Sequence, residues 1–271
     1  MKWLPDAEAA VAKVPFFVRK RVKQRVEEEA ARCGSPIVTL EHVDTCRNRF
    51  LNKMEDEVKG FRVEACFGTS GCPNRAVSDN AMAQRIEELA ASKNIRQFLT
   101  EQVSGALKLH HEFQVVLADC TNACSRPQIA DIGIIGACRP AMTDAECSTC
   151  GACVDACREG AIALADRVVY PEIDFAKCLA CGKCMSVCPT GPLRRGTEGY
   201  RVLVGGKLGR HPQLGRELPR ILTRDEALRV VDAALDFYRE RSLAGERFGE
   251  VLGRGGYENF IDFLKKRGVL I

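Results

Sequence analysis

The chain has 271 residues, a formal net charge of +4 and 15 cysteines. A chain of this length can bury a hydrophobic core without cross-links, so disulfides are not needed for its stability. Acidic and basic residues are interleaved and only 6% of the residues are aromatic, which argues against a nucleic-acid-binding surface. The clustered cysteines instead indicate metal ligation in a reducing compartment.

The N-terminal residues give no sign of export. The stretch MKWLPDAEAAVAKV has no apolar core of signal-peptide length, and no segment of the chain approaches the length of a membrane span. We therefore expect a cytoplasmic protein without a membrane span.

Four segments have the periodicity of amphipathic helices. Residues 6–31 predict one helix, which the sequence CGSP ends, and small apolar residues recur in it at a spacing of four. These residues are Val18, Val22, Val26 and Ala30. A second helix, SDNAMAQRIEELAASK, is expected to begin at the N-cap Ser78 or Asp79. A capping box of Thr223 and Glu226 predicts a third helix, and YENFIDFLKKRG predicts the last.

Short apolar runs between these helices predict strands. The runs are FRVEA, FQVVLA, IGIIGA and YRVLVGG, each bounded by Gly, Asp or Cys. Helices that alternate with strands indicate an α/β or α+β fold. Residues 138–196 break this pattern because they are rich in cysteine and turns, so we expect an inserted module there.

The insert contains two copies of the pattern CxxCxxCxxxC. In bacterial two-cluster ferredoxins the first three cysteines of each copy bind one 4Fe-4S cluster and the fourth binds the other cluster. One predicted set is Cys147, Cys150, Cys153 and Cys188, and the other is Cys178, Cys181, Cys184 and Cys157. A zinc site would use two CxxC pairs instead of two quartets. The insert therefore resembles a bacterial-type ferredoxin, whose role is one-electron transfer.

Two further cysteine pairs follow predicted strands. Cys66 and Cys72 form a CxxxxxC pair after FRVEA, and Cys120 and Cys124 form a CxxxC pair after FQVVLA. Neither pair closes a metal site alone. If the fold joins the two loops, four thiolates converge on one cluster.

This arrangement resembles the sirohaem-4Fe-4S nitrite and sulfite reductases. QIADIGIIGA and YRVLVGGKLGRHPQL are similar to segments of that family, and the insert lies between them, as in catalytic subunits of anaerobic sulfite reductases. The resemblance implies a third 4Fe-4S cluster on Cys66, Cys72, Cys120 and Cys124. It also implies that Cys124 is shared with the iron of a sirohaem as its axial ligand.

The resemblance covers residues 46–271, whereas residues 3–45 resemble the small helical module of a light-independent protochlorophyllide reductase subunit. The expected fold is α+β: a sulfite-reductase-like α/β domain with an inserted 2×(4Fe-4S) ferredoxin domain and an N-terminal helical module. The expected domains are 1–45 for the helical module, 46–137 and 197–271 for the two parts of the sirohaem/4Fe-4S domain, and 138–196 for the ferredoxin insert.

Sulfite and nitrite are anions, so their reduction needs fixed positive charge beside the haem. The family supplies arginines and a Lys-x-Lys element upstream of CxxxC, where this chain has Glu112 and Gln114. Arg62 is the first candidate for an anion-binding residue. The weaker candidates are Arg47, Arg49, Lys207 and Arg210, and His110 and His111 are candidate proton donors.

Family members of full length have two similar halves around the sirohaem, and this chain corresponds to one. We therefore expect a homo-oligomer or a hetero-oligomeric complex, with a redox donor protein or subunit as a further partner. Cys33, Cys46 and Cys138 lack partners at ligand spacing, so we expect them to be buried as small hydrophobic residues.

Three hypotheses follow from the sequence. The first is an anaerobic oxidoreductase that passes electrons from ferredoxin-type clusters to a sirohaem, where sulfite or nitrite is reduced. The second is a non-catalytic electron-transfer subunit of a larger redox complex. The third is a structural subunit whose third cluster binds no tetrapyrrole. Glu112 and Gln114 favour the second or third, and the four cysteines with the segment GGKLGR favour a retained cofactor.

Overall fold

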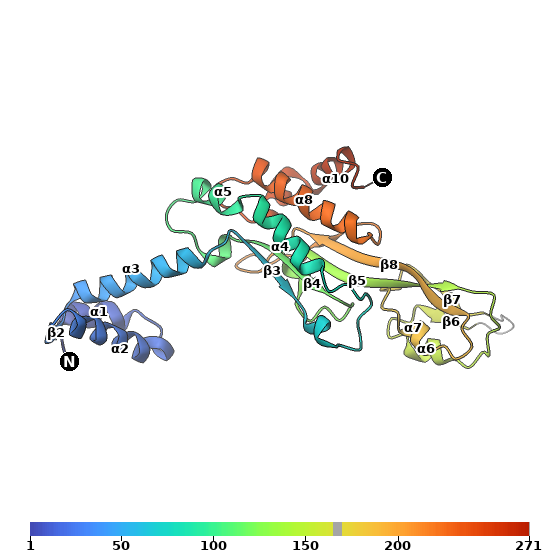
Figure 1. The fold of residues 1–271 in the computed structure, drawn as a ribbon, viewed down its shortest axis with the longest axis horizontal. Coiled ribbons are helices and arrows are strands. Elements are labelled where there is room, and N and C mark those ends of the chain that lie inside the picture. Colours follow the sequence, from blue (N-terminus) through green and yellow to red (C-terminus); the bar gives the residue numbers. More distant parts are fainter. Residues whose placement is uncertain (165–169, 271) are drawn as a thin grey trace. The chain divides into compact units, whose positions relative to one another are not determined.

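The computed structural model describes residues 1–164 and 170–270, apart from the side chains of residues 51–56. The chain divides into two compact units, one of residues 1–59 and 103–110 and the other of residues 60–102 and 111–271. Both contain helices and strands, so the fold is mixed, as predicted (Figure 1). In the described ranges no helix is both long and apolar enough to cross a membrane.

The first unit consists of three helices and a two-stranded parallel sheet. The strands are β1 (Lys2–Trp3) and β2 (Ile37–Val38), and the helices are α1 (Pro5–Ala12), α2 (Phe16–Arg32) and α3 (Leu40–Glu57). Its core contains Ala7, Val26, Ala30 and Val38, with Trp3 packed against it. The Trp3 ring N–H donates to Glu27 at 2.9 Å.

The prediction of one helix over residues 6–31 was wrong. The chain leaves the helix after Ala12 and resumes it at Phe16, with Pro15 at the N-cap of α2. Pro15 has no N–H to donate, and its ring disfavours a helical conformation at the preceding residue. The predicted end is confirmed, since α2 stops at Arg32, immediately before the sequence CGSP.

The second unit is built on a five-stranded sheet. The order is β3 (Phe61–Ala65), β4 (Phe113–Ala118), β5 (Ile132–Met142), β8 (Leu193–Val204) and β9 (Arg216–Glu217). The pairs β3–β4 and β4–β5 are parallel, whereas β5–β8 and β8–β9 are antiparallel. All four predicted strands are confirmed, and β5 and β8 extend beyond the predicted segments.

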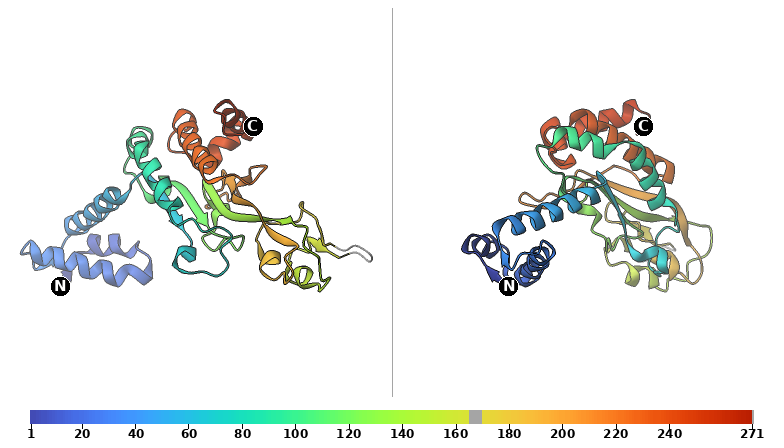
Figure 2. Two further views of the ribbon diagram at one scale, coloured as in Figure 1. Left: turned by 45° about the vertical axis from the view of Figure 1, so that its right-hand side comes forward. Right: turned by 60° about the vertical axis from the view of Figure 1, so that its left-hand side comes forward.

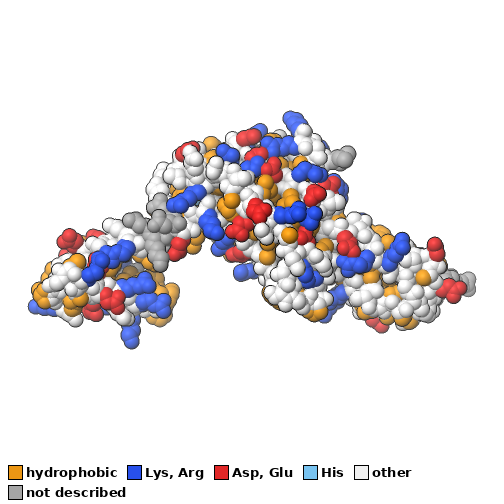
Figure 3. Space-filling model, in the orientation of Figure 1, with side chains coloured by type: hydrophobic (Ala, Val, Ile, Leu, Met, Phe, Trp, Pro, Cys, Tyr) orange, Lys and Arg blue, Asp and Glu red, His pale blue; other side chains and the backbone are white. Residues whose placement is uncertain are grey.

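Helices lie along one face of this sheet (Figures 1 and 2). They are α4 (Met82–Ser92), α5 (Ile95–Gln102), α8 (Arg224–Arg241), α9 (Phe248–Gly255) and α10 (Tyr257–Lys266). Phe113 of β4 packs against Tyr238 and Phe248, with ring centroids 5.2 and 5.4 Å apart. Acidic and basic side chains are interspersed over these helices, as the composition predicts (Figure 3).

The helix α4 begins later than predicted, at Met82 instead of Ser78 or Asp79. The Asp79 carboxylate accepts the N–H of Ala81 at 2.9 Å, so it shapes the turn before the helix. It also accepts the hydroxyl of Tyr200 at 3.1 Å. Asp79 is therefore used to connect the start of α4 to β8.

The cysteine-rich segment lies between the far ends of β5 and β8, which pair from Ile132–Val204 to Met142–Leu193. It contains α6 (Ala152–Ala156), β6 (Ile162–Ala163), β7 (Glu172–Ile173) and α7 (Lys183–Ser186). The expected limits of the insert, residues 138 and 196, fall within β5 and β8. The two long strands thus form a continuous support that leads from the main sheet to this segment.

A buried ion pair connects the sheet to the helical layer. Asp131, at the start of β5, accepts the N–H of Gln114 at 2.8 Å and the guanidinium of Arg247 at 2.6 Å. Burial raises the pKa of Asp131, and Arg247 opposes that shift. Removal of either partner would leave a buried charge without compensation, so the pair fixes how β4, β5 and α9 meet.

The capping box at α8 gives a test of local stability. The Thr223 side chain accepts the N–H of Glu226 at 3.3 Å, and the Glu226 carboxylate accepts the N–H of Thr223 at 2.8 Å. We expect Thr223→Ala to lower the free energy of unfolding by about 1 kcal/mol, because a terminal N–H of the helix loses its acceptor. Urea unfolding measures the loss, and Thr223→Ser should retain most of the stability. Equal losses in the two variants would contradict a role for the cap.

Candidate metal centres

Parallel pairing of β3 and β4 brings the first two cysteine loops together. The strands are in register from Phe61–Phe113 to Ala65–Leu117, so their carboxyl ends lie at the same edge of the sheet. The N–H of Cys66 donates to the Leu117 carbonyl at 3.0 Å. The N–H of Asp119 in turn donates to the sulfur of Cys66 at 3.3 Å. Cys66 and Cys120 therefore lie on adjacent loops although they are far apart in the sequence.

Contacts of Asp119 hold the two loops against each other. The side chain of Asp119 lies 2.7 Å from the Arg75 guanidinium, and its carbonyl accepts the N–H of Ala76 at 2.8 Å. Gly68 is needed in the first loop because a Cβ there would lie 2.2 Å from the Asp119 carboxylate. Sequence reasoning missed Arg75 and Asp119. The sequence feature that could have indicated this contact is a pair of opposite charges, each within three residues of a cysteine pair.

The CxxxC loop has an unusual backbone. Ala123 and Arg126 both have left-handed backbone angles, with φ of 52° and 62°. The Asn122 amide donates to the sulfur of Cys124 at 3.0 Å. Cys124 is exposed, whereas Cys66, Cys72 and Cys120 are half-buried.

The surroundings of Cys120 make its thiol harder to ionise, because they raise its pKa. Burial is the main factor that raises the pKa of Cys120, and the charges of Cys72, Cys124 and Cys66 raise it further. The structure therefore places side by side the two loops that carry the four cysteines expected to bind the third cluster.

The eight cysteines of the two CxxCxxCxxxC motifs form two groups, in the combination that the motif predicts. Two separate cavities are lined by these groups. The first is lined by Cys147, Cys150, Cys153 and Cys188, and the second by Cys157, Cys178, Cys181 and Cys184. In each group the last cysteine of one copy meets the first three of the other, as in two-cluster ferredoxins.

The two copies of the motif also repeat in their backbone. Thr149 and Ala180 have equivalent places in the copies and left-handed φ values of 53° and 54°. The N–H of each donates to the sulfur of the first cysteine of its copy at 3.4 Å. The following Gly151 and Gly182 also have positive φ, at 76° and 78°. This repeated conformation brings a backbone N–H to the first sulfur of each copy and strains two residues that are not glycine.

Burial makes the buried thiol of each group, Cys153 or Cys184, hard to ionise without a counter-charge. It raises the pKa of Cys184 to about 12, and the neighbouring Cys181, Cys178 and Cys157 add to that effect. Burial likewise raises the pKa of Cys153, with contributions from Cys147 and Cys188. Metal ligation deprotonates thiols, so a positively charged iron core fits the donor sets. Among the described residues, no group of three or more His, Cys, Asp or Glu is arranged to hold a single metal ion.

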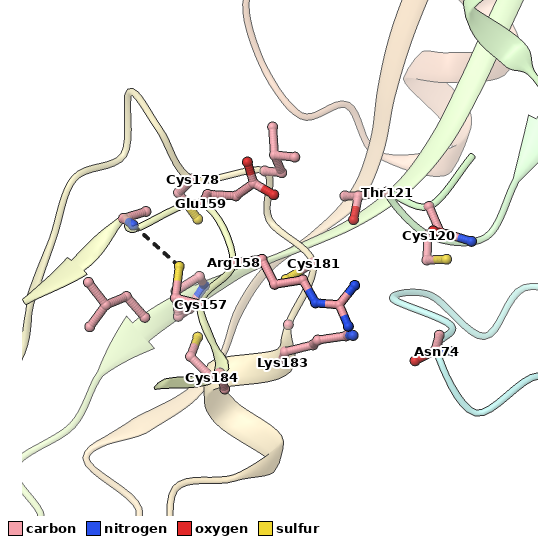
Figure 4. A pocket seen from close by; sticks show the side chains of 17 residues that line it. Asn74, Cys120, Thr121, Cys157, Arg158, Glu159, Cys178, Cys181, Lys183 and Cys184 are labelled. Atoms are coloured by element: carbon pink, nitrogen blue, oxygen red, sulfur yellow. Dashed lines mark hydrogen bonds between the residues drawn. The ribbon is translucent and has the colours of Figure 1, made fainter. Parts of the chain in front are cut away.

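Cys120 and the second ferredoxin-type set line the same cavity (Figure 4). The other lining residues include Asn74 and Thr121 from the first two loops, and Arg158 and Lys183 from the cysteine-rich segment. The set around Cys147 lies in a separate cavity. The geometry therefore orders the sets: the Cys147 set, the Cys178 set, and then the set that includes Cys120.

The face of the sheet away from the helices carries polar side chains of β3 and β4. Arg62 and Glu64 form a 2.9 Å ion pair there, and Arg62 lies opposite Gln114 in the strand register. These three residues line a shallow cavity with Ser125 and Arg126, which directly follow Cys124. Glu112 is only 3% exposed and does not line this cavity. Of the two positions expected to carry lysine, only Gln114 lines it.

The other candidate residues lie in different surroundings. Lys207 is 9% exposed and its ammonium pairs with Glu250 at 2.8 Å, whereas Arg210 is exposed. Arg49 pairs with the buried Glu29 of the first unit at 2.7 Å.

The three cysteines without ligand spacing differ in how deeply they are buried. Cys138 is fully buried, as predicted. Cys46 is half-buried and packs against the core of the first unit. The prediction for Cys33 was wrong, because it is exposed at the end of α2.

Comparison with protein families gives a match over most of the second unit. The model described as nitrite and sulphite reductase 4Fe-4S domain matches residues 61–268. The chain belongs to this family. A second model, described as proto-chlorophyllide reductase 57 kD subunit, matches residues 3–47. Both expected resemblances are thus confirmed.

Two curated sulfite reductases are similar to most of the chain. Coenzyme F420-dependent sulfite reductase of Methanocaldococcus jannaschii is 33% identical over 204 residues, which are 74% of this chain and 30% of that protein. An anaerobic sulfite reductase subunit of Salmonella typhimurium is 27% identical over 244 residues, 82% of this chain and 67% of that protein. The chain thus spans less than a third of the first relative.

Two further similarities concern the fold and the N-terminal module. The crystal structure of dissimilatory sulfite reductase I has a TM-score of 0.53 and 18% identity, and the match covers 74% of this chain and 51% of that one. It shows that the fold is shared. A light-independent protochlorophyllide reductase subunit of Chlorobium chlorochromatii is 54% identical over 41 residues, 15% of this chain and 8% of that protein.

Removal of one thiol tests the set formed by the first two loops. We expect Cys66→Ser to lower the iron content by about one cluster, because the predicted set loses one of its four ligands. Iron per chain, measured on anaerobically purified protein, checks this. The exposed Cys33→Ser is the control and should retain all the iron. Full iron content in Cys66→Ser would exclude Cys66 from the ligands.

Proposed function

We propose that this chain is an iron-sulfur oxidoreductase of the sirohaem sulfite and nitrite reductase type. In this proposal electrons pass from two ferredoxin-type clusters to a 4Fe-4S cluster coupled to sirohaem, where sulfite or nitrite is reduced. The observation that carries the proposal is the common cavity of Cys120 and the Cys157, Cys178, Cys181 and Cys184 set. It makes the third set of thiols the neighbour of a ferredoxin-type set.

Each set of four thiols would hold one 4Fe-4S cluster. Cys147, Cys150, Cys153 and Cys188 would hold the first, Cys178, Cys181, Cys184 and Cys157 the second, and Cys66, Cys72, Cys120 and Cys124 the third. Such clusters supply one-electron transfer, and sirohaem iron supplies a Lewis acid for the anion. The backbone N–H groups of Thr149, Ala180 and Asp119 donate to thiol sulfurs, which lowers the cost of negative charge at each set.

The two cysteines of the CxxxC loop differ in a way that suits their proposed roles. Cys120 lines the cavity shared with the ferredoxin-type segment, and Cys124 does not. Cys124 is the exposed member of its set and precedes two residues that line the open face of the sheet. We assign Cys120 to the side that receives electrons and Cys124 to the side shared with sirohaem.

Arg62 is our first candidate to bind the anion. It is half-exposed on the open face, and its pairing with Glu64 keeps its guanidinium beside the cavity. Lys207 and Arg210 remain weaker proposals: Lys207 would have to leave Glu250 to reach a substrate, whereas Arg210 lies outside the cavity that Arg62 lines.

The alternative is a non-catalytic electron-transfer subunit of a larger redox complex, with or without sirohaem. Gln114 and Glu64 favour it, because neither supplies positive charge to the open face. In either case we propose a homo-oligomer or a complex with another subunit, together with a redox donor protein. The similarity to a protein named as one subunit of an anaerobic sulfite reductase supports membership of a complex.

The visible spectrum of anaerobically purified protein separates these possibilities. We expect tetrapyrrole bands above the broad absorption of the clusters, and a change in those bands when sulfite or nitrite is added. Cluster absorption alone would contradict bound sirohaem. Tetrapyrrole bands that neither anion alters would favour the electron-transfer subunit.

A further inference from the structure

We propose that Arg158 and Lys183 raise the reduction potentials of the two clusters that flank their common cavity. This inference rests on the proposed function, because it takes the Cys178 set and the Cys120 set as cluster sites. It assigns to two exposed cations a role in passing electrons between these sites.

Both side chains lie in the cavity between the two sets. Arg158 directly follows Cys157, and Lys183 directly precedes Cys184. Both line the cavity together with Cys120 and Asn74. In Figure 4 the two side chains extend from the cysteine-rich segment into the space in front of Cys120 and Asn74. They therefore stand between the electron-donating and the electron-accepting set.

No carboxylate of the described residues neutralises the charge of Arg158 or Lys183 in an ion pair. Salt bridges of the described residues occupy many other basic side chains of this unit, such as Lys93, Arg195 and Arg201. Neither Arg158 nor Lys183 has an ion pair with a carboxylate of the described residues, and Glu159 is the one acidic residue among those that line the cavity. The charge of the described cavity lining, apart from the thiolates, is therefore positive.

Electrostatics determines whether this charge raises or lowers the reduction potentials. Four thiolates around a 4Fe-4S core make the site anionic, and each reduction adds one further negative charge. A nearby cation stabilises the reduced state more than the oxidised state, so it raises the reduction potential. Because Arg158 and Lys183 are exposed, solvent and salt weaken the effect without abolishing it.

The distant ferredoxin-type set provides an internal reference. Neither cation lines the cavity formed by Cys147, Cys150, Cys153 and Cys188. The cations therefore favour the electron on the Cys178 set relative to the Cys147 set. A gradient of this kind directs electrons toward Cys120.

Redox titration followed by electron paramagnetic resonance tests the proposal on the full chain with its clusters. We expect Arg158→Gln and Lys183→Gln each to lower the midpoint potentials of the two clusters beside the cavity, and to leave the potential of the Cys147 cluster unchanged. The reduced-to-oxidised ratio at a fixed potential should fall up to about tenfold, which corresponds to ~59 mV for one electron. Glu159→Gln should raise the same two potentials. Arg158→Lys keeps the positive charge, so it should leave both potentials at their wild-type values.

Controls separate this inference from the proposed function. Arg229→Gln removes the same charge from an exposed position on α8 and should shift no potential. The shifts in Arg158→Gln and Lys183→Gln should shrink at high salt. Unchanged potentials in a protein with all its clusters would overturn the role of the cations and leave the proposed function standing. If the wild-type chain lacks either flanking cluster, both proposals fail.

Discussion

The parallel register of β3 and β4 is the constraint on which the rest of the site depends. It places the carboxyl ends of two strands side by side, so the sulfur of Cys66 accepts the N–H of Asp119, the residue before Cys120. A slip of one residue would reverse the faces of every side chain on β3. Phe61 would then leave the core and Arg62 would enter it, so burial of the apolar face holds the cysteine loops together.

Bringing these loops together costs free energy, because it places thiols close to one another and requires unfavourable backbone conformations. Buried thiols repel one another when ionised, and Ala123, Thr149 and Ala180 adopt left-handed backbone conformations that cost energy in residues other than glycine. Metal ligation would supply a compensating free energy, because the thiols would then carry negative charge beside positive iron. Each set thus combines a left-handed residue that is not glycine with one thiol whose pKa is raised by burial.

Sequence alone predicted the strands and the combinations of cysteines, because both follow from local patterns. Periodicity located β3 and β4 at their observed bounds, and the spacing within CxxCxxCxxxC decides which thiols can turn toward one centre. The ion pair of Arg75 with Asp119 was missed, since it joins two loops whose proximity depends on the sheet. The sequence also could not tell which ferredoxin-type set lies beside Cys120, because this depends on where β5 and β8 carry the ferredoxin-type segment.

Cys138 shows how the main sheet and the ferredoxin-type segment are joined. It is fully buried on β5, and its N–H donates to the Ala180 carbonyl at 2.7 Å. The backbones of Cys138 and Cys181 also pair in an isolated parallel β-bridge. Upstream on the same strand, Gly136 allows the Asp119 carbonyl to approach, since a Cβ there would lie 2.5 Å from it. One strand thus contacts the loop of the Cys178 set and the loop of Cys120. The separation between these two sets is therefore fixed by the geometry of β5, so the backbone of Cys138 holds the second set in its place relative to the third.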